Sequence, residues 1–435
     1  MINNPLQVFL NHTARMGESY YYYFGGIKKV LISSDPDVLR HILKDNYTNY
    51  PKSTIQIDRM GHFLGPGLLT SHGDYWRQQR RLIQRGFQAN TLATLVPIMH
   101  ASLEESLSRF NATLHQDALD LCSWMMSLTF SMVARSLFSA RMTDDEIQLI
   151  SDTITVIQTF LVRQIVRPYL APWFAVSGEL GRHEAMRERG DEILLRHIRS
   201  RRAQPGKEGD LLQILLGALN RDTGQGMTDA QVLCESMQIL VAGHETSSTA
   251  LAWTLYLLCR HPDYLQRARD EFNSVVGNAR LTSSHIPQLK LNTHILEEAL
   301  RIYPPFWMVD RVAINEDRVK DIEIARGTTI IAFIYGTHHA ARHWTDPESF
   351  RPERFDEDSE QINSGFTYLP FGAGARGCIG ANYAMLQMLM ILSAILRRYE
   401  FSLISDHAVE THPMIILRAR GGIRVRIRPV EAEQS

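Results

Sequence analysis

Cys378 lies in a glycine-rich loop whose residue types suit a flat, metal-bearing ligand. The loop reads FGAGARGCIG over 371–380. Its glycines permit backbone angles and close approaches that other residues resist, and nearby backbone N–H groups can stabilise a thiolate. A thiolate pushes electron density onto haem iron and favours O–O cleavage, and Arg376 could bind a haem propionate. Haem iron is therefore the ligand that the loop suggests, although a lone cysteine is more often a buried structural residue.

A second segment with chemical potential reads Ala242-Gly-His-Glu-Thr246, inside a stretch with helical periodicity. Glycine is costly within a helix unless something must approach the backbone, and dioxygen on iron is a suitable guest. The Thr246 hydroxyl can bond a carbonyl of the preceding turn or a water, while the Glu245 carboxyl can relay protons. His244 receives no role. The simpler interpretation of this segment is a merely polar stretch of helix.

Two pairs of residues have helical spacing. Trp76 and Arg80 are four apart and share a face, so an indole N–H and a guanidinium can reach one anionic group. An ordinary amphipathic helix would show the same spacing. Glu298 and Arg301 are three apart, and in isolation they predict a surface ion pair worth roughly a few tenths of a kcal/mol.

The loop around Cys378 resembles the haem-binding signature of the cytochrome P450 family, and the resemblance covers nearly the whole chain. The matching residues are Phe371, Gly374, Arg376, Cys378 and Gly380. The resemblance implies that Cys378 is the axial ligand of haem b and that Glu245 and Thr246 form the oxygen-activation motif. It also implies a set of further cofactor-binding residues, which are Trp76, Arg80, Arg311, Phe371, Gly372, Arg376 and Gly380.

The same resemblance implies a structural network and a substrate pocket. Glu298 and Arg301 match the family's E-x-x-R motif, and Arg354 of Pro352-Glu-Arg-Phe355 would complete a buried network behind the haem loop. The implied pocket residues are Ala242, Phe306, Trp307, Met308, Val309, Met414 and Ile415. This apolar set suits a fatty acid, terpenoid, carotenoid or steroid, and the sequence does not choose among them. A plain core segment is the alternative.

Hydrophobic periodicity predicts helices near 74–86, 93–140, 145–175, 180–202, 228–260 and 381–396. Thr228 and Gln231 have the spacing of a capping box at the start of a long helix. Strand signals are confined to 20–32, 328–334 and 415–427, and prolines make 340–371 irregular. We expect one mainly α domain over 1–435 with a minor sheet, the triangular helical prism around haem that the resemblance implies.

Bulk properties exclude several classes of protein. The formal net charge is −1, so no global basic field would attract nucleic acid or anionic lipid. Four scattered cysteines argue against a disulfide framework and a CxxC zinc site. We find no export signal, and the apolar stretches are interrupted before the length of a membrane span. We therefore expect a cytoplasmic monomer with no stable membrane anchor.

The expected activity is insertion of one oxygen atom from dioxygen into an apolar substrate. No flavin or nicotinamide fingerprint is present, so electrons must come from an external ferredoxin or flavodoxin with its NAD(P)H-dependent reductase. Arg77, Arg81 and Arg85 recur every four residues and could bind such an acidic partner, although a solvated basic face is the more ordinary explanation.

Three other functions are compatible with parts of the sequence. A haem-thiolate peroxygenase or isomerase would need no external electrons, but the Glu245–Thr246 pair argues against it. A haem-based gas sensor or ligand carrier would need Cys378 without a proton relay. A helical scaffold without haem would leave the glycine-rich loop and Gly243 unexplained.

Overall fold

The computed structural model describes the chain except residues 1–3, 25, 27, 114–117, 140, 141, 206–208, 221–223, 278, 357–361, 363, 364, 405–407 and 431–435. The chain divides into two compact units, which we describe separately. The first unit contains residues 1–53, 115–125 and 246–435, and the second contains 54–114 and 126–245. The expectation of one domain over 1–435 stays a prediction.

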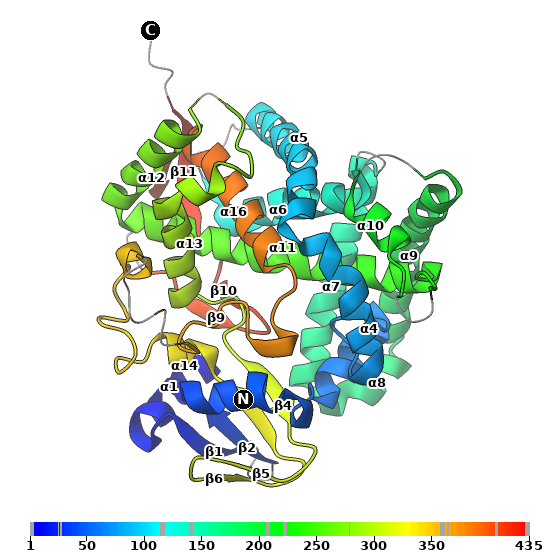
Figure 1. Cartoon of the computed structure of the whole chain (residues 1–435), viewed down its shortest axis with the longest axis vertical. Helices are drawn as coiled ribbons and strands as arrows, with labels where there is room; N and C mark the ends of the chain where they lie inside the picture. Colours follow the sequence, from blue (N-terminus) through cyan, green and yellow to red (C-terminus); the bar gives the residue numbers. More distant parts are fainter. Residues whose placement is uncertain are drawn as a thin grey trace. The chain divides into compact units, whose positions relative to one another are not determined.

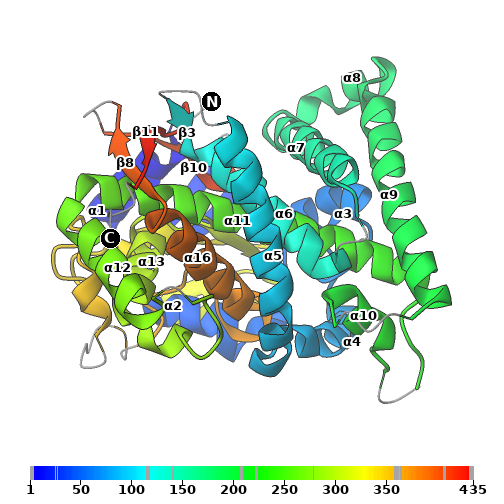
Figure 2. The ribbon, with the colours of Figure 1, turned by 90° about the horizontal axis from the view of Figure 1, so that it is seen from above.

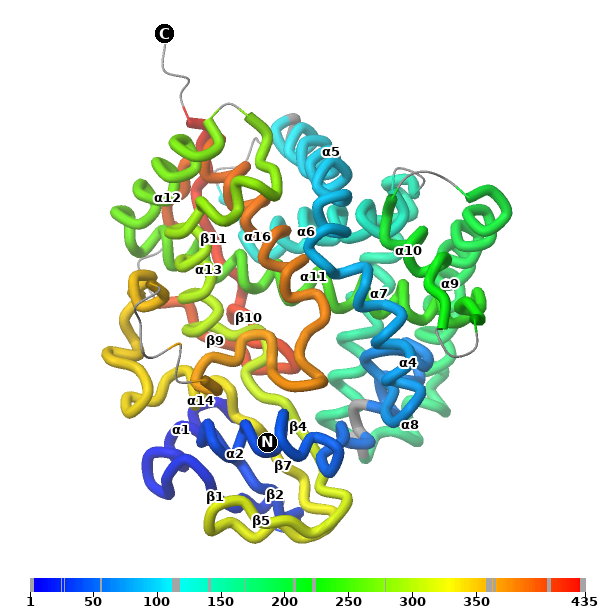
Figure 3. The backbone as a smooth tube through the Cα atoms, in the orientation of Figure 1, coloured from blue at the N-terminus to red at the C-terminus, as the bar shows by residue number. Residues whose placement is uncertain are grey.

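The first unit contains a four-stranded sheet with the order β1-β2-β7-β4 (Figure 3). Its strands are β1 Ser19–Phe24, β2 Lys28–Ser33, β7 Thr329–Ala332 and β4 Val309–Val312. Strands β2 and β7 are parallel, and the other pairs are antiparallel. Leu31 and Ile330 enter one hydrophobic cluster while Ile32 and Ile331 enter another, because successive side chains point to opposite faces.

Two strand predictions are confirmed by this sheet, and one strand was not predicted. The hairpin over 20–32 turns at Gly26, whose φ is +73°, whereas Gly25 lies outside the described residues. The signal over 328–334 corresponds to β7. Strand β4 was missed because the preceding Pro304 and Pro305 indicated an irregular segment. This strand matters because it carries Arg311.

The remaining strands are short, which confirms a minor sheet content. A three-stranded sheet has the order β3-β11-β8, and two ladders pair β10 with β9 and β5 with β6. These strands are β3 Leu119–Asp120, β5 Asp317–Val319, β6 Ile322–Ile324, β8 Tyr399–Leu403, β9 Thr411–Pro413, β10 Leu417–Ala419 and β11 Arg424–Pro429.

Helices make up most of the rest of the first unit (Figure 1). The α-helices wholly within it are α1 Pro5–Met16, α2 Pro36–Arg40, α12 Pro262–Val275, α13 Lys290–Ile302, α14 Ile334–His338 and α16 Ala381–Leu396. Shorter turns are η1 His41–Asp45, η2 Tyr47–Asn49, η7 Ile286–Gln288, η8 Pro352–Phe355 and η9 Gly374–Arg376. Helix α16 has the predicted bounds and is buried along most of its length.

The described part of the second unit is helical (Figure 2). Its elements are η3 Ile55–Arg59, α3 Met60–Leu64, α4 Gly73–Ile83, η4 Gln84–Phe87, α5 Ala89–Thr113, α7 Asp144–Val166, η6 Pro168–Leu170, α8 Ala171–Val176, α9 Glu179–Ala203 and α10 Leu211–Gly217. Helices α6 Leu121–Phe138 and α11 Asp229–Arg260 each contribute residues to both units.

The sequence located most helices but missed some of their ends. The stretch predicted over 93–140 is two helices, α5 and α6, with β3 between them. The stretch over 145–175 breaks after Val166, where Pro168 and Pro172 interrupt the pattern. The capping box of α11 is confirmed, because Gln231 N–H donates to Thr228 Oγ1 at 3.2 Å and Thr228 N–H donates to Gln231 Oε1 at 2.9 Å.

Within the described part of the chain, two helices are long and apolar enough to cross a membrane, by length and composition alone. They are α6, with a mean hydropathy of 1.2, and α7, with 1.3 in its most apolar stretch. Of these stretches, 67% of α6 and 39% of α7 is buried. Neither helix was expected from the sequence, because the apolar runs considered there are interrupted by polar residues. A largely buried core helix passes the same test, so this is weak evidence of a membrane span.

Candidate functional site

The loop before α16 holds Cys378 at an exposed position. Cys378 N–H donates to the Phe371 carbonyl at 2.8 Å, which closes the loop on itself. Gly372 and Gly374 both have φ +66°, a left-handed conformation that favours glycine. A Cβ on Gly374 would lie 2.0 Å from the Leu43 carbonyl oxygen, so this position cannot accept a side chain without a shift of the backbone.

The other three cysteines differ from Cys378 in exposure. Cys122, Cys234 and Cys259 are only partly exposed. Burial, together with the nearby Asp120 carboxylate, raises the pKa of the Cys122 thiol to about 12, and burial alone raises that of Cys259 to about 12. Burial also raises the pKa of Cys234. These thiols stay protonated at neutral pH, whereas Cys378 lies ahead of the N-terminus of α16, a position that stabilises negative charge.

A cluster of cations in the first unit brings together Lys52, Arg311 and Arg376. Arg311 is on β4 and is 7% exposed, and Lys52 follows Pro51, whose carbonyl accepts the Val312 N–H at 2.9 Å. Burial and the charges of Arg311 and Arg376 lower the pKa of Lys52 to about 7, against the opposite effect of Asp310. The sequence predicted Arg311 and Arg376 but missed Lys52. An anion bound here would relieve the mutual repulsion of these groups.

A fully buried acid–base network surrounds Glu298 on α13. Arg301 donates to Glu298 through Nε at 2.7 Å and Nη2 at 2.9 Å, and Arg354 Nε donates to Glu298 Oε1 at 2.8 Å. The Arg351 N–H adds a fourth donor at 3.0 Å. The structure thus brings together the three residues Glu298, Arg301 and Arg354, as the sequence expected, and a surface ion pair is excluded because Glu298 and Arg301 are both 0% exposed.

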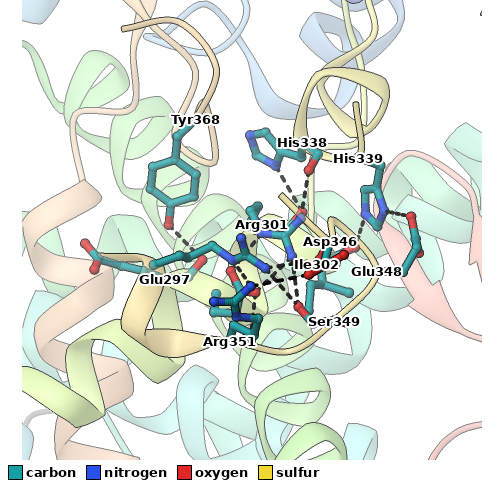
Figure 4. A network of polar contacts seen from close by, with 12 residues as sticks. Glu297, Arg301, Ile302, His338, His339, Asp346, Glu348, Ser349, Arg351 and Tyr368 are labelled. Atoms are coloured by element: carbon teal, nitrogen blue, oxygen red, sulfur yellow. Dashed lines mark hydrogen bonds and ion pairs between the residues drawn. The ribbon is translucent and has the colours of Figure 1, made fainter. Parts of the chain in front are cut away.

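The two guanidiniums extend the network to backbone carbonyls (Figure 4). Arg301 Nη1 donates to the His338 carbonyl at 2.8 Å, and Arg354 donates to the carbonyls of Thr345, Asp346 and Ser349 at 2.9–3.2 Å. The three acceptors of Arg354 lie in the irregular stretch predicted over 340–371. The network therefore fixes a segment that has little secondary structure of its own.

Helix α11 remains α-helical through Gly243, and its neighbour explains the glycine. A Cβ at Gly243 would lie 2.9 Å from Val133 Cγ2 on α6, so the two helices pack closely at this point. The Thr129 hydroxyl also donates to the His244 carbonyl at 3.0 Å. The contact with Val133 gives Gly243 a packing role, and the approach of dioxygen to its backbone stays a prediction. Glu245 is 5% exposed and Thr246 is half-buried.

Trp76 and Arg80 share one face of α4, as their spacing predicted. The Arg80 guanidinium lies 5.9 Å from the centre of the Trp76 ring, and Trp76 is 5% exposed. Both residues belong to the second unit. That they bind the same group as Arg311 and Arg376 stays a prediction.

The residues predicted to line a pocket differ in exposure. Phe306 is 41% exposed and Ile415 is 39% exposed, whereas Trp307 is 2% exposed and packs against Phe9 and Phe333 in a hydrophobic cluster. The Trp307 indole N–H donates to the Met414 carbonyl at 2.9 Å, which brings the two predicted segments together. Met308, Val309 and Ala242 are partly exposed.

Comparison with known proteins identifies the family. The family model described as "Cytochrome P450" matches residues 2–425. The chain belongs to the cytochrome P450 family. Its activity is therefore that of a monooxygenase, and its cofactor is haem b. Members of this family use dioxygen, apolar substrates and redox partners.

Curated relatives cover most of this P450 chain. It is 27% identical over 438 residues to the human "Ultra-long-chain fatty acid omega-hydroxylase", with 94% of this chain and 81% of the relative aligned. It is 29% identical to "Cytochrome P450 716A67" of Medicago truncatula, with the same coverage. It is also 28% identical to "Protein LUTEIN DEFICIENT 5, chloroplastic" of Arabidopsis thaliana, over 87% of this chain and 66% of the relative.

Solved structures agree with the fold. The haem domain of "cytochrome P450DA" matches with a TM-score of 0.85 at 22% identity, covering 99% of this chain and 93% of that domain. A triple mutant of the same haem domain matches with a TM-score of 0.88 at 23% identity, covering 99% and 94%. The predicted mainly α P450 fold with a minor sheet is confirmed.

The donor groups of this P450 fit a haem. Cys378 is an exposed thiol in a loop shaped by glycine, which suits one axial bond to iron. Lys52, Arg311 and Arg376 are close enough to interact electrostatically, and a cluster of cations would suit the two propionates of a haem. Among the described residues, no group of three or more His, Cys, Asp or Glu side chains could hold a metal ion without a prosthetic group.

Proposed function

We propose that Cys378 is the axial thiolate of the haem and that this P450 inserts one oxygen atom from dioxygen into a long-chain apolar substrate. The observation that carries the proposal is the exposed thiol in its closed, glycine-shaped loop ahead of α16. The loop contributes Phe371, Gly372 and Gly380 around the cofactor. When bound, haem supplies the activation of dioxygen.

The propionates of haem b would be held by cationic and N–H donor side chains. The proposed cations are Lys52, Arg80, Arg311 and Arg376, and Trp76 would donate its indole N–H. Charge-assisted hydrogen bonds from such groups both orient and retain a carboxylate. We expect these residues to govern cofactor affinity rather than the chemistry of oxidation.

Glu245 and Thr246 would manage protons during turnover. The Glu245 carboxyl is buried and can take up or release a proton, and the Thr246 hydroxyl can donate a hydrogen bond to a reacting oxygen or a water. A Thr246→Ala variant should consume dioxygen and reductant while forming less product, because proton delivery is misplaced. A product yield per electron equal to that of the wild type would remove this role.

A fatty acid is the first substrate to test. The human relative is named an ultra-long-chain fatty acid omega-hydroxylase, and the exposed Phe306 and Ile415 add apolar surface in the two segments predicted to contact substrate. Ala242, Trp307, Met308, Val309 and Met414 are the other residues proposed to contact the substrate. Terpenoids, carotenoids and steroids are the other classes to screen.

The decisive experiment for this function uses isotopically labelled dioxygen with the purified holoenzyme, a surrogate ferredoxin and its reductase. Product from a fatty acid panel should contain one labelled oxygen atom. A panel of terpenoids, carotenoids and steroids tests the other substrate classes under the same conditions. Label found only in water, with every panel, would contradict the monooxygenase assignment for this chain.

An acidic ferredoxin or flavodoxin, served by an NAD(P)H-dependent reductase, is the proposed electron donor. Arg77, Arg81 and Arg85 are exposed on α4 and η4, although Arg77 also contacts Asp74 at 3.1 Å. Changing Arg77 and Arg81 to Gln should slow reduction of the iron several-fold and weaken its salt dependence, with substrate affinity unchanged. The matched control is Arg199→Gln, an exposed arginine on α9. Equal reduction rates for all three proteins would exclude this docking surface.

We also propose that residues 1–435 act as one haem-binding domain and that the protein is a cytoplasmic monomer without a stable membrane anchor. Net charge of −1 gives no general attraction to anionic lipid. Sedimentation of the purified protein without vesicles tests whether it is a monomer, and sedimentation with vesicles tests whether it lacks a stable membrane anchor. Co-sedimentation with vesicles would contradict the absence of a membrane anchor, and α6 and α7 would then be the segments to test.

A further inference from the structure

His338, the last residue of α14, is a fully buried histidine with a hydrogen bond at each ring nitrogen. The Leu369 N–H donates to His338 Nε2 at 2.7 Å, and His338 Nδ1 lies 3.1 Å from the Arg301 carbonyl. A backbone N–H can only donate and a carbonyl can only accept. The ring must therefore be neutral with its proton on Nδ1.

His338 connects two segments of the first unit. The first segment contains Arg301, which belongs to the Glu298 network. The Arg301 guanidinium donates to the His338 carbonyl at 2.8 Å, while the His338 ring donates to the Arg301 carbonyl. Figure 4 shows Arg301 and His338 facing each other across these contacts. The exchange of two bonds fixes the end of α13 against α14.

The second segment contains Leu369 and continues directly into the cysteine loop. Its carbonyl accepts the Gly372 N–H at 3.0 Å, and the Phe371 carbonyl accepts the Cys378 N–H at 2.8 Å. A continuous series of hydrogen bonds therefore runs from Arg301 through His338 and Leu369 to the backbone of Cys378. Of these links, the one through His338 is the only one that depends on a side chain able to titrate near neutral pH.

The surroundings of His338 oppose its protonation. Burial is the main reason that the pKa of His338 lies well below its usual range, and the neighbouring His339 and Arg301 lower the pKa further. The groups around it are Arg301 and Glu298 from α13, His339 beside it, and Tyr368, whose ring stacks on it at 5.5 Å. Because the folded state favours the neutral ring, its stabilising effect is complete above the ordinary histidine pKa and is lost as pH falls below it.

We infer that His338 is a positioning residue that couples the Glu298 network to the Cys378 loop, and that protonation of its ring releases the loop. A protonated Nε2 cannot accept the Leu369 N–H, so the first fixed point of the loop would be lost. This inference rests on the proposed role of Cys378 as the iron ligand. We therefore expect that acid causes the iron to lose its thiolate ligand while the haem stays bound.

His339 provides a matched control because it is adjacent and also has two hydrogen bonds. Its Nδ1 lies 2.8 Å from Glu348 Oε1, its Nε2 lies 2.9 Å from the Ile302 carbonyl, and its ring stacks on Tyr335 at 3.9 Å. None of these three partners belongs to the segment that leads to Cys378. Removing His339 costs similar packing and bonding but leaves the Leu369 N–H with its acceptor.

The test follows the Soret band of the reduced carbon-monoxide complex of purified holoenzymes from about pH 8 to about pH 5. A thiolate ligand gives this complex a strongly red-shifted band, and loss of the thiolate moves the band to shorter wavelength. We expect the wild type and His339→Phe to keep the red-shifted band until the acid range. In His338→Phe the band should be lost at least about tenfold faster at every pH, since the Leu369 N–H has no acceptor.

His338→Gln separates bonding from titration and serves if His338→Phe does not fold. Its amide can accept from Leu369 and donate to Arg301 but cannot take up a proton in this range. It should restore the red-shifted band and lack the acid transition of the wild type. An acid transition in His338→Gln like that of the wild type, or equal effects of His338→Phe and His339→Phe, would overturn the inference. A wild-type enzyme without the red-shifted band at any pH would instead refute the proposed role of Cys378.

Discussion

The Glu298 network and the cation cluster around Lys52 lie in the same unit but differ in how far their charges are balanced within the protein. In the first, one carboxylate accepts bonds from two guanidiniums and a backbone N–H, and the remaining donors reach carbonyls. In the second, burial and two guanidiniums lower the pKa of Lys52 to about 7 despite Asp310. The network completes its own bonding, which suits a structural role, whereas the cluster is stabilised by an added anion, which suits a binding role.

The largest expected effect follows removal of the carboxylate from the network. Glu298→Ala leaves Arg301 and Arg354 buried without their acid, which should cost about 3–5 kcal/mol of folding stability and prevent haem incorporation. Thermal unfolding and the haem-to-protein ratio measure this. The control is the neighbouring Glu297→Gln, whose half-buried carboxyl has a pKa raised to about 7 by burial and should tolerate the change. A Glu298→Ala protein with normal haem content would contradict the structural role.

A smaller loss of folding stability is expected from Arg354→Lys, which keeps the positive charge but not the planar guanidinium group. The variant loses bonds to the carbonyls of Thr345, Asp346 and Ser349, which should cost about 2 kcal/mol. Denaturant unfolding of the holoenzyme reports the change. Arg351→Lys is the matched control because its side chain is 51% exposed and Glu298 is bound by its backbone N–H. Equal stability of the two variants would mean that the carbonyl bonds contribute little.

Neutralising the cluster should separate cofactor binding from folding. In Lys52→Gln and Arg311→Gln, we expect the haem-free protein to unfold at the same temperature as the wild type or higher, because repulsion is relieved. Haem affinity should fall about tenfold in each, the effect of one lost charge-assisted bond. Titration of haem into the haem-free protein measures the affinity. Lower stability with unchanged affinity would place these residues in the scaffold instead.

The smallest predicted effect is a pH dependence of haem affinity. A bound anion raises the pKa of Lys52 above its value of about 7, so binding takes up a proton at higher pH. Affinity should then fall as pH rises above about 7, by at most about tenfold per pH unit. The same titration repeated across the pH range checks this. Lys52→Gln should remove the slope, and an unchanged slope in that variant would assign it to another group.

Local patterns in the sequence were sufficient for much of the fold. Periodicity predicted helix α16, a capping box predicted the start of α11, and turn residues predicted the hairpin of β1 and β2. Each of these patterns involves residues that are close together in the sequence. The Glu298–Arg301 pair was found because both residues lie on one helix, and Arg354 because a family motif contains it. The structure then showed their burial, which no local pattern reports.

Long-range contacts account for what the sequence missed. Lys52 has no motif, and it reaches Arg311 because the Val312 N–H bonds to the Pro51 carbonyl across about 260 residues of chain. His338 is a lone histidine in the sequence, and only its two hydrogen bonds distinguish it. The close packing at Gly243 was missed for the same reason, since Val133 on α6 meets it from more than a hundred positions away.

The central claim is that the Cys378 sulfur binds the haem iron as a thiolate. The most direct measurement is the absorption spectrum of the reduced carbon-monoxide complex of the wild type, Cys378→Ser and Cys122→Ser, each reconstituted with haem. We predict a strongly red-shifted Soret band for the wild type and Cys122→Ser, because the half-buried Cys122 thiol of the wild type stays protonated, and no such band for Cys378→Ser. A red-shifted band that survives in Cys378→Ser would contradict the claim.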